Sequence, residues 1–346
     1  MGSSGVEGRD MSFEVEGKRI LVTGATGLIG GHVAARLHAG GALVRALARN
    51  PERARALMSL GAEVVRGDMT DPASLRAAVD GCQGVVHMAG VLGDEFKPLD
   101  AFRAVNVEGT RAIAEAALDA GVERFLHVST IAVYGFGAGA GTNERSPRRP
   151  GTDPYCLTKD EGQSVVERMA LDRGLPAVIV QPSQVYGPKD EAWTLGPLRL
   201  LKAGKLVLPS RGRGLVQPIF VDDLAEGVLS SLERGRTGEA YILCGARVVT
   251  VAEFFGHFAR MVGKSRIPSV PVWLAAGIAT VSEVAARLTG RPPVFTRSAV
   301  RFITDFETTY DGAKAKAELG FEPRTSLEED MEKVRRWLEE EGAVVL

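Results

Sequence analysis

Short apolar runs alternate with stretches of helical periodicity through the first half of the chain. Ile20 to Val22 is an unbroken apolar run, and Ile29, Val33 and Leu37 then recur at the spacing of one helix face. The same alternation predicts further strands at 43–47, 64–65, 85–88, 125–128 and 178–180, and a long helix from about 99 to 120. Unbroken apolar strands between helices are typical of a parallel sheet that helices cover on both faces. The pattern therefore predicts a doubly wound α/β fold.

The regularity fades after about residue 182. Residues 186–217 and 236–325 are richer in Pro, Gly and irregular apolar segments, and we interpret them as a smaller, discontinuous substrate-binding lobe. The segment from Val221 begins a helix that we expect to pack back on the large sheet. The large domain is then expected to comprise residues 17–185 with about 218–235, preceded by a disordered leader at 1–16. A charged amphipathic helix, expected to be a surface element, follows in 326–346.

Composition narrows the class of protein. The chain has 346 residues with 42 basic and 43 acidic side chains, a balance that argues against general nucleic-acid or anionic-membrane binding. Three isolated cysteines indicate neither a metal site nor a disulfide framework, and they fit a reducing cytoplasm. The apolar stretch 270–288 contains Pro271, Glu283 and Arg287, so it is interrupted too often for a membrane span. A partly buried helix is favoured there, and contact with a bilayer surface stays open.

A glycine-rich turn follows the first strand. Gly24, Gly27 and Gly30 lead directly into the first helix, in a GxxGxxG spacing. Small residues let the backbone approach a pyrophosphate, and the helix N-terminus offers free N–H groups and a favourable dipole. The turn predicts a dinucleotide site, with Thr26, Leu28 and Ile29 as further contacts; a tightly packed strand–helix turn is the alternative.

The ends of the next strands bear on the choice of dinucleotide. No Asp or Glu occurs at the tip of the second strand, and Arg49 could pair with a 2′-phosphate. NADP(H) is therefore favoured and NAD(H) is possible, with an ordinary surface arginine as the alternative. Asp68, followed by Met69, ends the third strand and could accept from the adenine amino group or cap its loop. Ala89 and Gly90 end the fourth strand and would permit close approach of the cofactor; His87 before them is given no chemistry.

Tyr155 and Lys159 are four positions apart in a predicted helix, which places them on one face. A phenol with an ordinary pKa of about 10 is a poor base at neutral pH. A neighbouring ammonium favours the phenolate, so we expect a lowered pKa for Tyr155. Such a pair suits alcohol oxidation or carbonyl reduction, although a surface ion pair has the same spacing.

These motifs together resemble the extended short-chain dehydrogenase/reductase family, also called the NAD-dependent epimerase/dehydratase family, over nearly all of residues 18–340. The ordered set that carries the resemblance is the turn at 23–30, Asp68, His87-x-Ala89-Gly90, Ser129-Thr130 with Val133-Tyr134-Gly135, Tyr155-x-x-x-Lys159, the run 181–188 and Val221-Asp222-Asp223. Each motif alone is weak, whereas their order is specific.

The resemblance implies a Rossmann-like sheet with a C-terminal substrate lobe, and roles for individual residues. Tyr155 is expected to be the general acid/base, Thr130 to hydrogen-bond the reacting oxygen, and Lys159 to hold the ribose hydroxyls and tune Tyr155. Asn106 resembles the structural and relay asparagine of the family. Pro182 and Val185 fall where the nicotinamide face is packed.

Departures from the family pattern refine the activity. Ile131 and Ala132 stand where the sugar dehydratases have an Asp–Glu pair, and neither side chain can transfer a proton, which argues against a dehydratase. Val216 stands where the nucleotide-sugar epimerases have an arginine that holds the nucleotide, and Arg213 is out of register. A buried diphosphate needs compensating charge, so this difference argues against a nucleotide-sugar substrate. Gln181 replaces an arginine. The remaining resemblance is to the dihydroflavonol-reductase-like and 3β-hydroxysteroid-dehydrogenase-like branch.

The sequence thus favours an NADP(H)-dependent oxidoreductase that interconverts a ketone and a secondary alcohol on a fairly apolar small molecule. The alternatives are an NAD-dependent nucleotide-sugar epimerase and a non-catalytic dinucleotide sensor. A cytoplasmic homodimer is expected from the resemblance, joined through helices near 100–118 and 154–172. Aromatic residues of the small lobe could line an apolar pocket or pack in its core, namely Trp193, Phe254, Phe255, Trp273 and Phe295.

Overall fold

The computed structural model describes residues 12–343 apart from 93–97, 136, 290–295 and 306. A seven-stranded sheet forms the large domain, in the order β11-β6-β5-β4-β1-β2-β3, and all of its paired neighbours are parallel. Its strands are β1 (Arg19–Thr23), β2 (Leu43–Ala48), β3 (Glu63–Arg66), β4 (Gly84–His87), β5 (Arg124–Val128), β6 (Ala177–Pro182) and β11 (Ala240–Leu243). The predicted doubly wound, Rossmann-like fold is confirmed.

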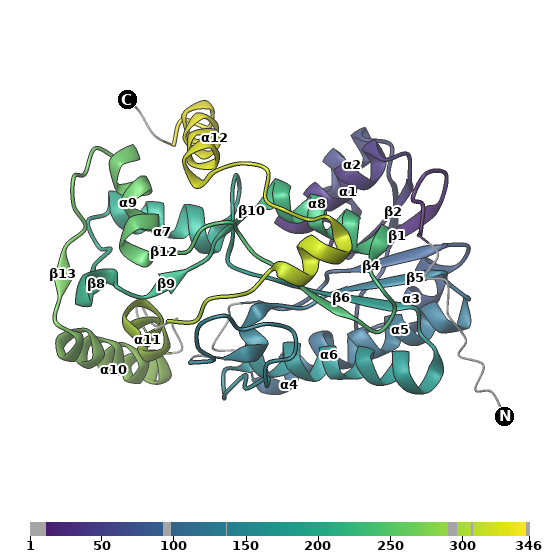
Figure 1. Cartoon of the computed structure of the whole chain (residues 1–346), viewed down its shortest axis with the longest axis horizontal. Helices are drawn as coiled ribbons and strands as arrows, with labels where there is room; N and C mark the ends of the chain where they lie inside the picture. The colour runs from purple at the N-terminus through teal and green to yellow at the C-terminus, as the bar shows by residue number, and fades with distance from the viewer. Residues whose placement is uncertain (1–11, 93–97, 136, 290–295, 306, 344–346) are drawn as a thin grey trace.

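Helices cover both faces of the sheet, as Figure 1 shows. One face packs on α1 (Leu28–Ala39), α2 (Arg55–Ser59) and α8 (Val221–Arg234), through residues such as Val33, Leu37 and Leu224. The other packs on α3 (Pro72–Val79), α5 (Thr110–Asp119) and α6 (Pro154–Arg173), through residues such as Leu75 and Ile113. Burial on both faces explains why the strands are continuously apolar rather than alternating.

The long helix expected between 99 and 120 is continuous but irregular. It consists of α4 (Leu99–Arg103), a π-helical turn η2 (Ala104–Gly109) and α5. Gly162 of α6 packs so closely on this turn that a Cβ there would lie 2.3 Å from the Asn106 carbonyl oxygen. The wide turn therefore sets Asn106 against the helix that carries Tyr155 and Lys159.

The smaller lobe has its own core of aromatic and aliphatic residues. Phe254 and Phe258 are fully buried at its centre. Its regular elements are β7 (Val185–Tyr186), η4 (Glu191–Leu195), α7 (Gly196–Lys202), β8 (Leu208–Pro209), η5 (Ser210–Gly212), β9 (Leu215–Val216), β10 (Ile219–Phe220), β12 (Val249–Thr250), α9 (Val251–Met261), β13 (Ser269–Val270), α10 (Val272–Thr289) and α11 (Arg297–Asp305). Shorter helical turns elsewhere are η1 (Pro51–Ala54), η3 (Ile131–Tyr134) and η6 (Ala315–Leu319).

The structure corrects three parts of the expected division. Phe13 and Val15, near the end of the expected disordered leader, are buried in the core of the large domain. Residues 240–243, assigned from the sequence to the small lobe, form β11 of the large sheet, and Ala315 and Leu319 of η6 also pack against that sheet. The C-terminal helix α12 (Leu327–Glu340) is more than a solvated element, because Met331, Val334 and the rest of its apolar face enter the lobe core. Most of the expected leader and the segment containing Phe295 lie outside the described residues.

Candidate active site

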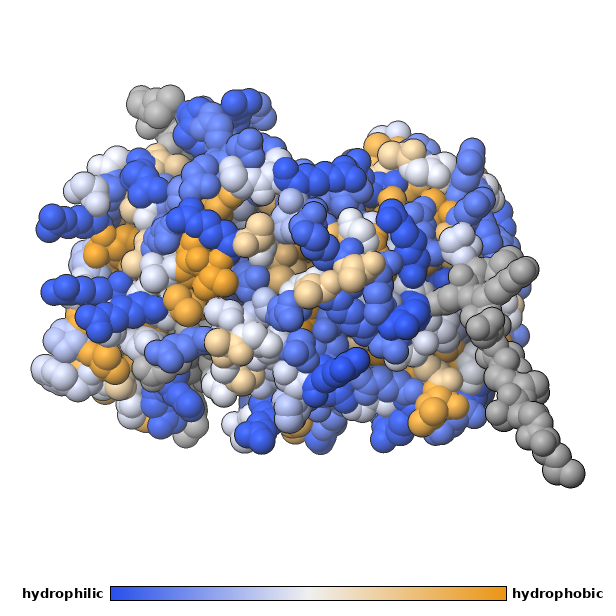
Figure 2. Space-filling view, in the orientation of Figure 1, coloured by the Kyte–Doolittle hydropathy of each residue, from blue (hydrophilic) through white to orange (hydrophobic). Residues whose placement is uncertain are grey.

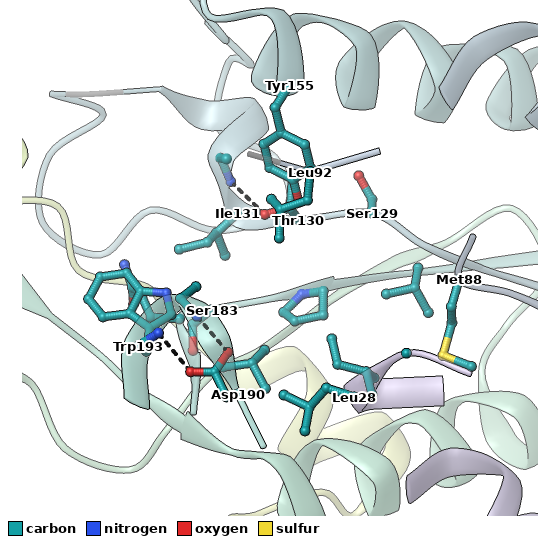
Figure 3. A pocket seen from close by; sticks show the side chains of 18 of the residues that line it. Leu28, Met88, Leu92, Ser129, Thr130, Ile131, Tyr155, Ser183, Asp190 and Trp193 are labelled. Atoms are coloured by element: carbon teal, nitrogen blue, oxygen red, sulfur yellow. Dashed lines mark hydrogen bonds between the residues drawn. The ribbon is translucent and has the colours of Figure 1, made fainter. Parts of the chain in front are cut away.

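A cavity of about 470 Å³ lies where the carboxyl edge of the large sheet meets the small lobe. Parallel register brings the ends of β1, β4, β5 and β6 to this edge, with Thr23 opposite His87 and Val128 opposite Val180. Figure 3 shows side chains from both parts of the chain converging on the cavity. Of the predicted site residues, eight line it: Gly24, Gly27, Leu28, Ile29, Thr130, Tyr155, Pro182 and Val185. This is the edge at which doubly wound sheets bind ligands.

The glycine turn forms a cradle of bare backbone on one wall. A Cβ on Gly24 would lie 2.9 Å from the Ala89 nitrogen, and one on Gly30 would lie 2.1 Å from the Gly24 carbonyl oxygen. Helix α1 begins immediately afterwards, and its N-cap residue Gly27 supplies no side-chain cap. Its first N–H groups therefore remain available to an anion, so the turn fits the pyrophosphate of a dinucleotide.

A chain of buried hydrogen bonds fixes this turn to the neighbouring strand. The Thr110 hydroxyl donates to the Asn106 carbonyl at 2.8 Å, so its oxygen accepts from His87 Nε2 at 2.9 Å. His87 Nδ1 then accepts from the Thr23 hydroxyl at 2.8 Å, and Thr23 Oγ1 in turn accepts from the Ala89 N–H at 3.1 Å. Burial and the charge of Lys159 lower the pKa of His87 to about 3. His87 is thus a neutral imidazole that links Thr23 to Thr110, which agrees with giving it no catalytic role.

Two further cofactor candidates, Arg49 and Asp68, lie along the same edge of the sheet but do not line the cavity. Arg49 is exposed just beyond β2, and Asp68 follows β3. The Asp68 carboxylate accepts from the Thr70 N–H at 2.9 Å and the Thr70 hydroxyl at 2.7 Å; these bonds, with the charge of Arg49, lower its pKa. Asp68 therefore does cap its loop, while its adenine contact stays a prediction.

Other predicted contacts are displaced from the cavity as well. Met69 is buried, and its side chain packs close to Gly109. Thr26 is exposed at the tip of the glycine turn. Ala89 and Gly90 lie beside the turn, and a Cβ on Gly90 would approach the Asn106 side chain at 3.2 Å. These small residues keep the backbone of the two strand ends close together.

Tyr155 and Thr130 lie next to each other in the lining of the cavity. Tyr155 lies in the first turn of α6, whose N-cap Asp153 accepts from the Cys156 N–H at 2.9 Å. Its ring points toward Thr130, which follows β5 and accepts from the Ala132 N–H at 3.2 Å (Figure 3). Burial raises the pKa of Tyr155 to about 12, and the hydrogen bond from Thr130 opposes that rise. The expected lowering of this pKa is wrong for this structure, because burial exceeds the stabilisation of the phenolate.

Lys159 lies one helical turn below Tyr155 and is directed at the end of β5. Its Nζ donates to the Val128 carbonyl at 2.7 Å, and burial lowers its pKa to about 8. Asn106 is held by other groups: its amide nitrogen donates to Thr158 Oγ1 at 3.0 Å, and its amide oxygen accepts from the Val91 N–H at 2.7 Å. Both residues brace α6 against the sheet, so their roles toward the ribose and as a relay stay predictions.

Several cavity residues were not singled out from the sequence. The Ser129 hydroxyl is buried on the wall and has no hydrogen-bond partner among the described residues, so it could satisfy a bound polar group. Asp190 accepts from the backbone N–H of Trp193 at 2.7 Å and so caps η4, the helical turn that carries Trp193. Tyr310 reaches the same cavity from more than a hundred residues further along. Ser129 belongs to the same motif as Thr130 but was given no role, whereas no local pattern marks Asp190 or Tyr310.

The other aromatic candidates have different places. Of the four candidates that the structure describes, Trp193 lines the cavity, and it stacks on Phe255 with ring centroids 6.1 Å apart. Phe254 and Phe255 belong to the lobe core, and Trp273 is 75% exposed on α10. Core packing therefore accounts for the two phenylalanines.

The departures from the family pattern have clear structural outcomes. Ile131 and Ala132 line the cavity where a dehydratase needs proton-transferring groups. Val216 is buried in the lobe core and offers no charge to a diphosphate. Gln181 is buried between two partners: its amide oxygen accepts from the Tyr134 hydroxyl at 2.7 Å, and its amide nitrogen donates to Gln163 at 3.1 Å. An uncharged network thus replaces the arginine contacts.

A glycine cradle and a Thr–Tyr pair that open on one cavity define an NAD(P)-dependent enzyme acting on an alcohol or ketone carbon. The profile described as the NAD dependent epimerase/dehydratase family matches residues 20–244, so the chain belongs to that family. The ordered motifs had the same implication, and the resemblance is confirmed, including its dihydroflavonol-reductase-like branch.

Named relatives match over almost their entire lengths. The chain is 30% identical to the 4-hydroxy-2-methyl-3-oxo-4-farnesyl-3,4-dihydroquinoline-1-oxide ketoreductase of Stigmatella aurantiaca, over 92% of this chain and 96% of that protein. It is 31% identical to a protein named as a dihydroflavonol 4-reductase in Synechocystis, over 94% and 95%. The solved dTDP-glucose 4,6-dehydratase of Streptomyces venezuelae, with NAD bound, is 27% identical over 93% and 97%, with a TM-score of 0.77.

Metal sites and membrane-spanning helices are both absent from the part of the chain that the structure describes. No group of three or more His, Cys, Asp or Glu side chains there could hold a metal ion. Within the same ranges, no helix is both long and apolar enough to cross a membrane.

Proposed function

We propose that the protein is an NADP(H)-dependent ketoreductase for a fairly apolar small molecule. The observation that carries the proposal is the Thr130–Tyr155 pair, which faces a largely apolar cavity shared with the glycine cradle. Leu92, Ile131 and Trp193 contribute apolar side chains to the cavity lining. The ketoreductase from Stigmatella supports this substrate class, because its name specifies a farnesylated ketone.

The residues around the cavity suit reduction. A dinucleotide held by the glycine cradle would supply the hydride for the carbonyl carbon. Tyr155, with a pKa of about 12, is protonated at neutral pH and gives its proton to the developing alkoxide. Thr130 stabilises the same oxygen by a hydrogen bond, and the apolar walls exclude water from the charge that develops. Lys159 ties the first turns of α6 to the end of β5, and we propose that it also binds the ribose hydroxyls.

The proposed preference for NADP(H) rests on the tip of β2. Arg49 is exposed there, and the residues from 43 to 48 include no acidic side chain that would repel a 2′-phosphate. An exposed guanidinium can bind such a phosphate bidentately. NAD(H) use is the alternative outcome of the same assays.

The test is a panel of apolar ketones followed at NADPH absorbance, with NADH for comparison, on the wild type and Tyr155→Phe. We expect stoichiometric NADPH consumption by the wild type, and a loss of turnover in the variant with NADPH binding retained. Tyr241→Phe is the control, because it removes a hydroxyl that contacts Glu318 outside the cavity. Near-normal turnover by Tyr155→Phe would contradict the mechanism, and sugar interconversion without net redox would favour an epimerase.

The assembly and location are proposed on the same basis. A homodimer through α5 and α6 is expected, and light scattering after size-exclusion chromatography tests it. A cytoplasmic location suits the three cysteines Cys82, Cys156 and Cys244, all of which are free thiols. We also propose a division into a dinucleotide-binding domain, which includes β11 and η6, and a smaller substrate-binding lobe.

A further inference from the structure

Helix α10 presents an apolar face to solvent. Trp273, Val281 and Leu288 are 75%, 70% and 83% exposed, unusually high values for large apolar side chains. Ile278 and Val284 are about half exposed on the same helix. Figure 1 places α10 at the outer corner of the small lobe, and orange side chains appear at that corner of the largely hydrophilic surface in Figure 2.

The exposed residues share one side of the helix. At 3.6 residues per turn, positions 273, 274, 278, 281, 284 and 288 occupy roughly 140° of the circumference and about 22 Å of length. Gly277 and Ala285 complete this arc, which includes no charged residue. The opposite side, with Ala275, Ala279 and Ala286, is buried in part against Val300 of α11. Helix α10 thus packs on the small lobe through one apolar side, and a second apolar side, which carries Trp273, Val281 and Leu288, is exposed to solvent.

The sequence around this face is rich in basic residues. From the end of α9 to the end of α11, residues 262–305 carry six basic and two acidic side chains, a net charge of +4, whereas the whole chain carries −1. The one acidic residue of α10, Glu283, projects away from the apolar arc and pairs with Arg297 at 2.9 Å. Arg266 and Arg301 are exposed nearby in the sequence. The near-neutral total charge, which argued against anionic membranes, therefore conceals a local excess.

A second copy of the chain fits this surface poorly. In a two-fold contact the same patch meets itself, so the excess of positive charge would face an equal excess. A straight, charge-free arc with basic neighbours is instead what interfacial amphipathic helices present to anionic lipids. We propose that α10 docks in the plane of an anionic bilayer surface, with Trp273, Val281 and Leu288 inserted at the boundary between headgroups and acyl chains. This inference is independent of the proposed reaction.

The experiment is co-sedimentation of the full chain with vesicles of phosphatidylcholine containing phosphatidylglycerol, and with vesicles of phosphatidylcholine alone. We expect binding to the anionic vesicles that weakens as salt is raised, because screening removes the electrostatic part. The double variant Val281→Glu/Leu288→Glu should lower the partition coefficient about tenfold or more, since carboxylates cannot enter the apolar layer. Both positions are exposed, so the fold should tolerate the change.

The control is Leu60→Glu, which places a carboxylate on an exposed leucine beside α2, in the large domain. It should bind vesicles as the wild type does. The proposal is overturned if the wild type does not sediment with anionic vesicles, or if the double variant binds as well as the control. It is equally overturned if the double variant changes only the oligomeric state, because the face would then be a contact between copies of the chain.

Discussion

At the residue scale, burial decides the protonation of Tyr155 and Lys159, the proposed catalytic pair. A sequence shows that Tyr155 and Lys159 share a helix face, but it does not show how far each is removed from water. Desolvation raises the pKa of the phenol to about 12 and lowers that of the ammonium to about 8. Desolvation always favours the neutral form, so the two shifts have opposite signs. Thr130 could be placed from its motif, whereas the partner of Lys159, the Val128 carbonyl, could not.

The buried Lys159 predicts an inverse relation between stability and function. Its pKa is about 8 in the folded chain and 10.5 unfolded, a difference of about 3 kcal/mol at 1.4 kcal/mol per unit. Removing the charge leaves the Val128 carbonyl unpaired, which costs about 1 kcal/mol. Lys159→Met should therefore raise the free energy of unfolding at pH 7 by about 2 kcal/mol, while it impairs turnover.

The pH dependence supplies the check. Between pH 8 and 10.5 the unfolded wild type binds more protons at this lysine than the folded protein, so wild-type stability gains as pH rises. The advantage of Lys159→Met should shrink over that window in denaturant titrations. Lys316→Met, at a lysine with a 65% exposed side chain, should show no such trend. Parallel pH profiles for wild type and Lys159→Met would contradict the prediction.

Arg49 predicts the choice of dinucleotide. Arg49→Asp replaces the guanidinium at the β2 tip by a group that repels a 2′-phosphate and can accept from a free 2′-hydroxyl. NADPH binding should weaken about tenfold or more, with NADH binding maintained or improved, as measured by fluorescence titration. Arg53→Asp makes the same change of charge on the exposed side of η1 and should leave the preference unaltered. An unchanged ratio in Arg49→Asp would show that Arg49 is a surface residue only.

At the element scale, the glycine turn and helix α1 act as one unit. Apolar periodicity located β1 and α1, and the glycine spacing located the turn between them. Only the three-dimensional structure shows how closely the two pack. A Cβ on Gly30 of α1 would lie 2.1 Å from the carbonyl oxygen of Gly24 in the turn. The sequence missed β11 for a related reason: Tyr241, Ile242 and Leu243 form a short run after irregular segments, and only pairing with β6 identifies it as a sheet strand.

Neighbouring glycines of α1 should respond in opposite ways to alanine. Gly30→Ala puts a methyl group against the Gly24 carbonyl, so it should lower stability by about 1 to 3 kcal/mol and weaken NADPH binding. Gly31→Ala meets its nearest atom, the Ala25 carbonyl oxygen, at 3.7 Å. It should stabilise α1 by about 0.5 to 1 kcal/mol, because glycine is a poor helix former. Thermal unfolding with and without NADPH measures both, and equal effects would refute the close-packing argument.

At the scale of the whole molecule, α12 closes the core of the small lobe. The alternation of charged and apolar residues predicted an amphipathic helix, but not the surface that it covers. Met331, Val334 and Leu338 are buried there, although the helix is more than 60 residues from α9 in sequence. A contact of this kind has no local signature, since it depends on how the chain returns across the lobe.

Leu338 therefore predicts how strongly α12 contributes to stability. Leu338→Ala leaves a cavity in the lobe core and should lower the free energy of unfolding by about 2 to 5 kcal/mol. Arg336→Ala, on the exposed side of the same helix, should have little effect, because surface ion pairs contribute little. Chemical denaturation of both variants tests this, and a negligible effect of Leu338→Ala would return α12 to the status of a surface element.

The interleaving of the two lobes has a consequence for biosynthesis. The cavity draws on residues from Gly24 to Tyr310, and β11 completes the sheet only after the first part of the lobe has been made. On the ribosome, the large sheet cannot close until the chain has emerged beyond residue 243, and the nascent edge of β6 stays unpaired until then. Pairing over such separations is slow. A nascent chain of this design spends its synthesis with an open sheet edge, which chaperones can bind.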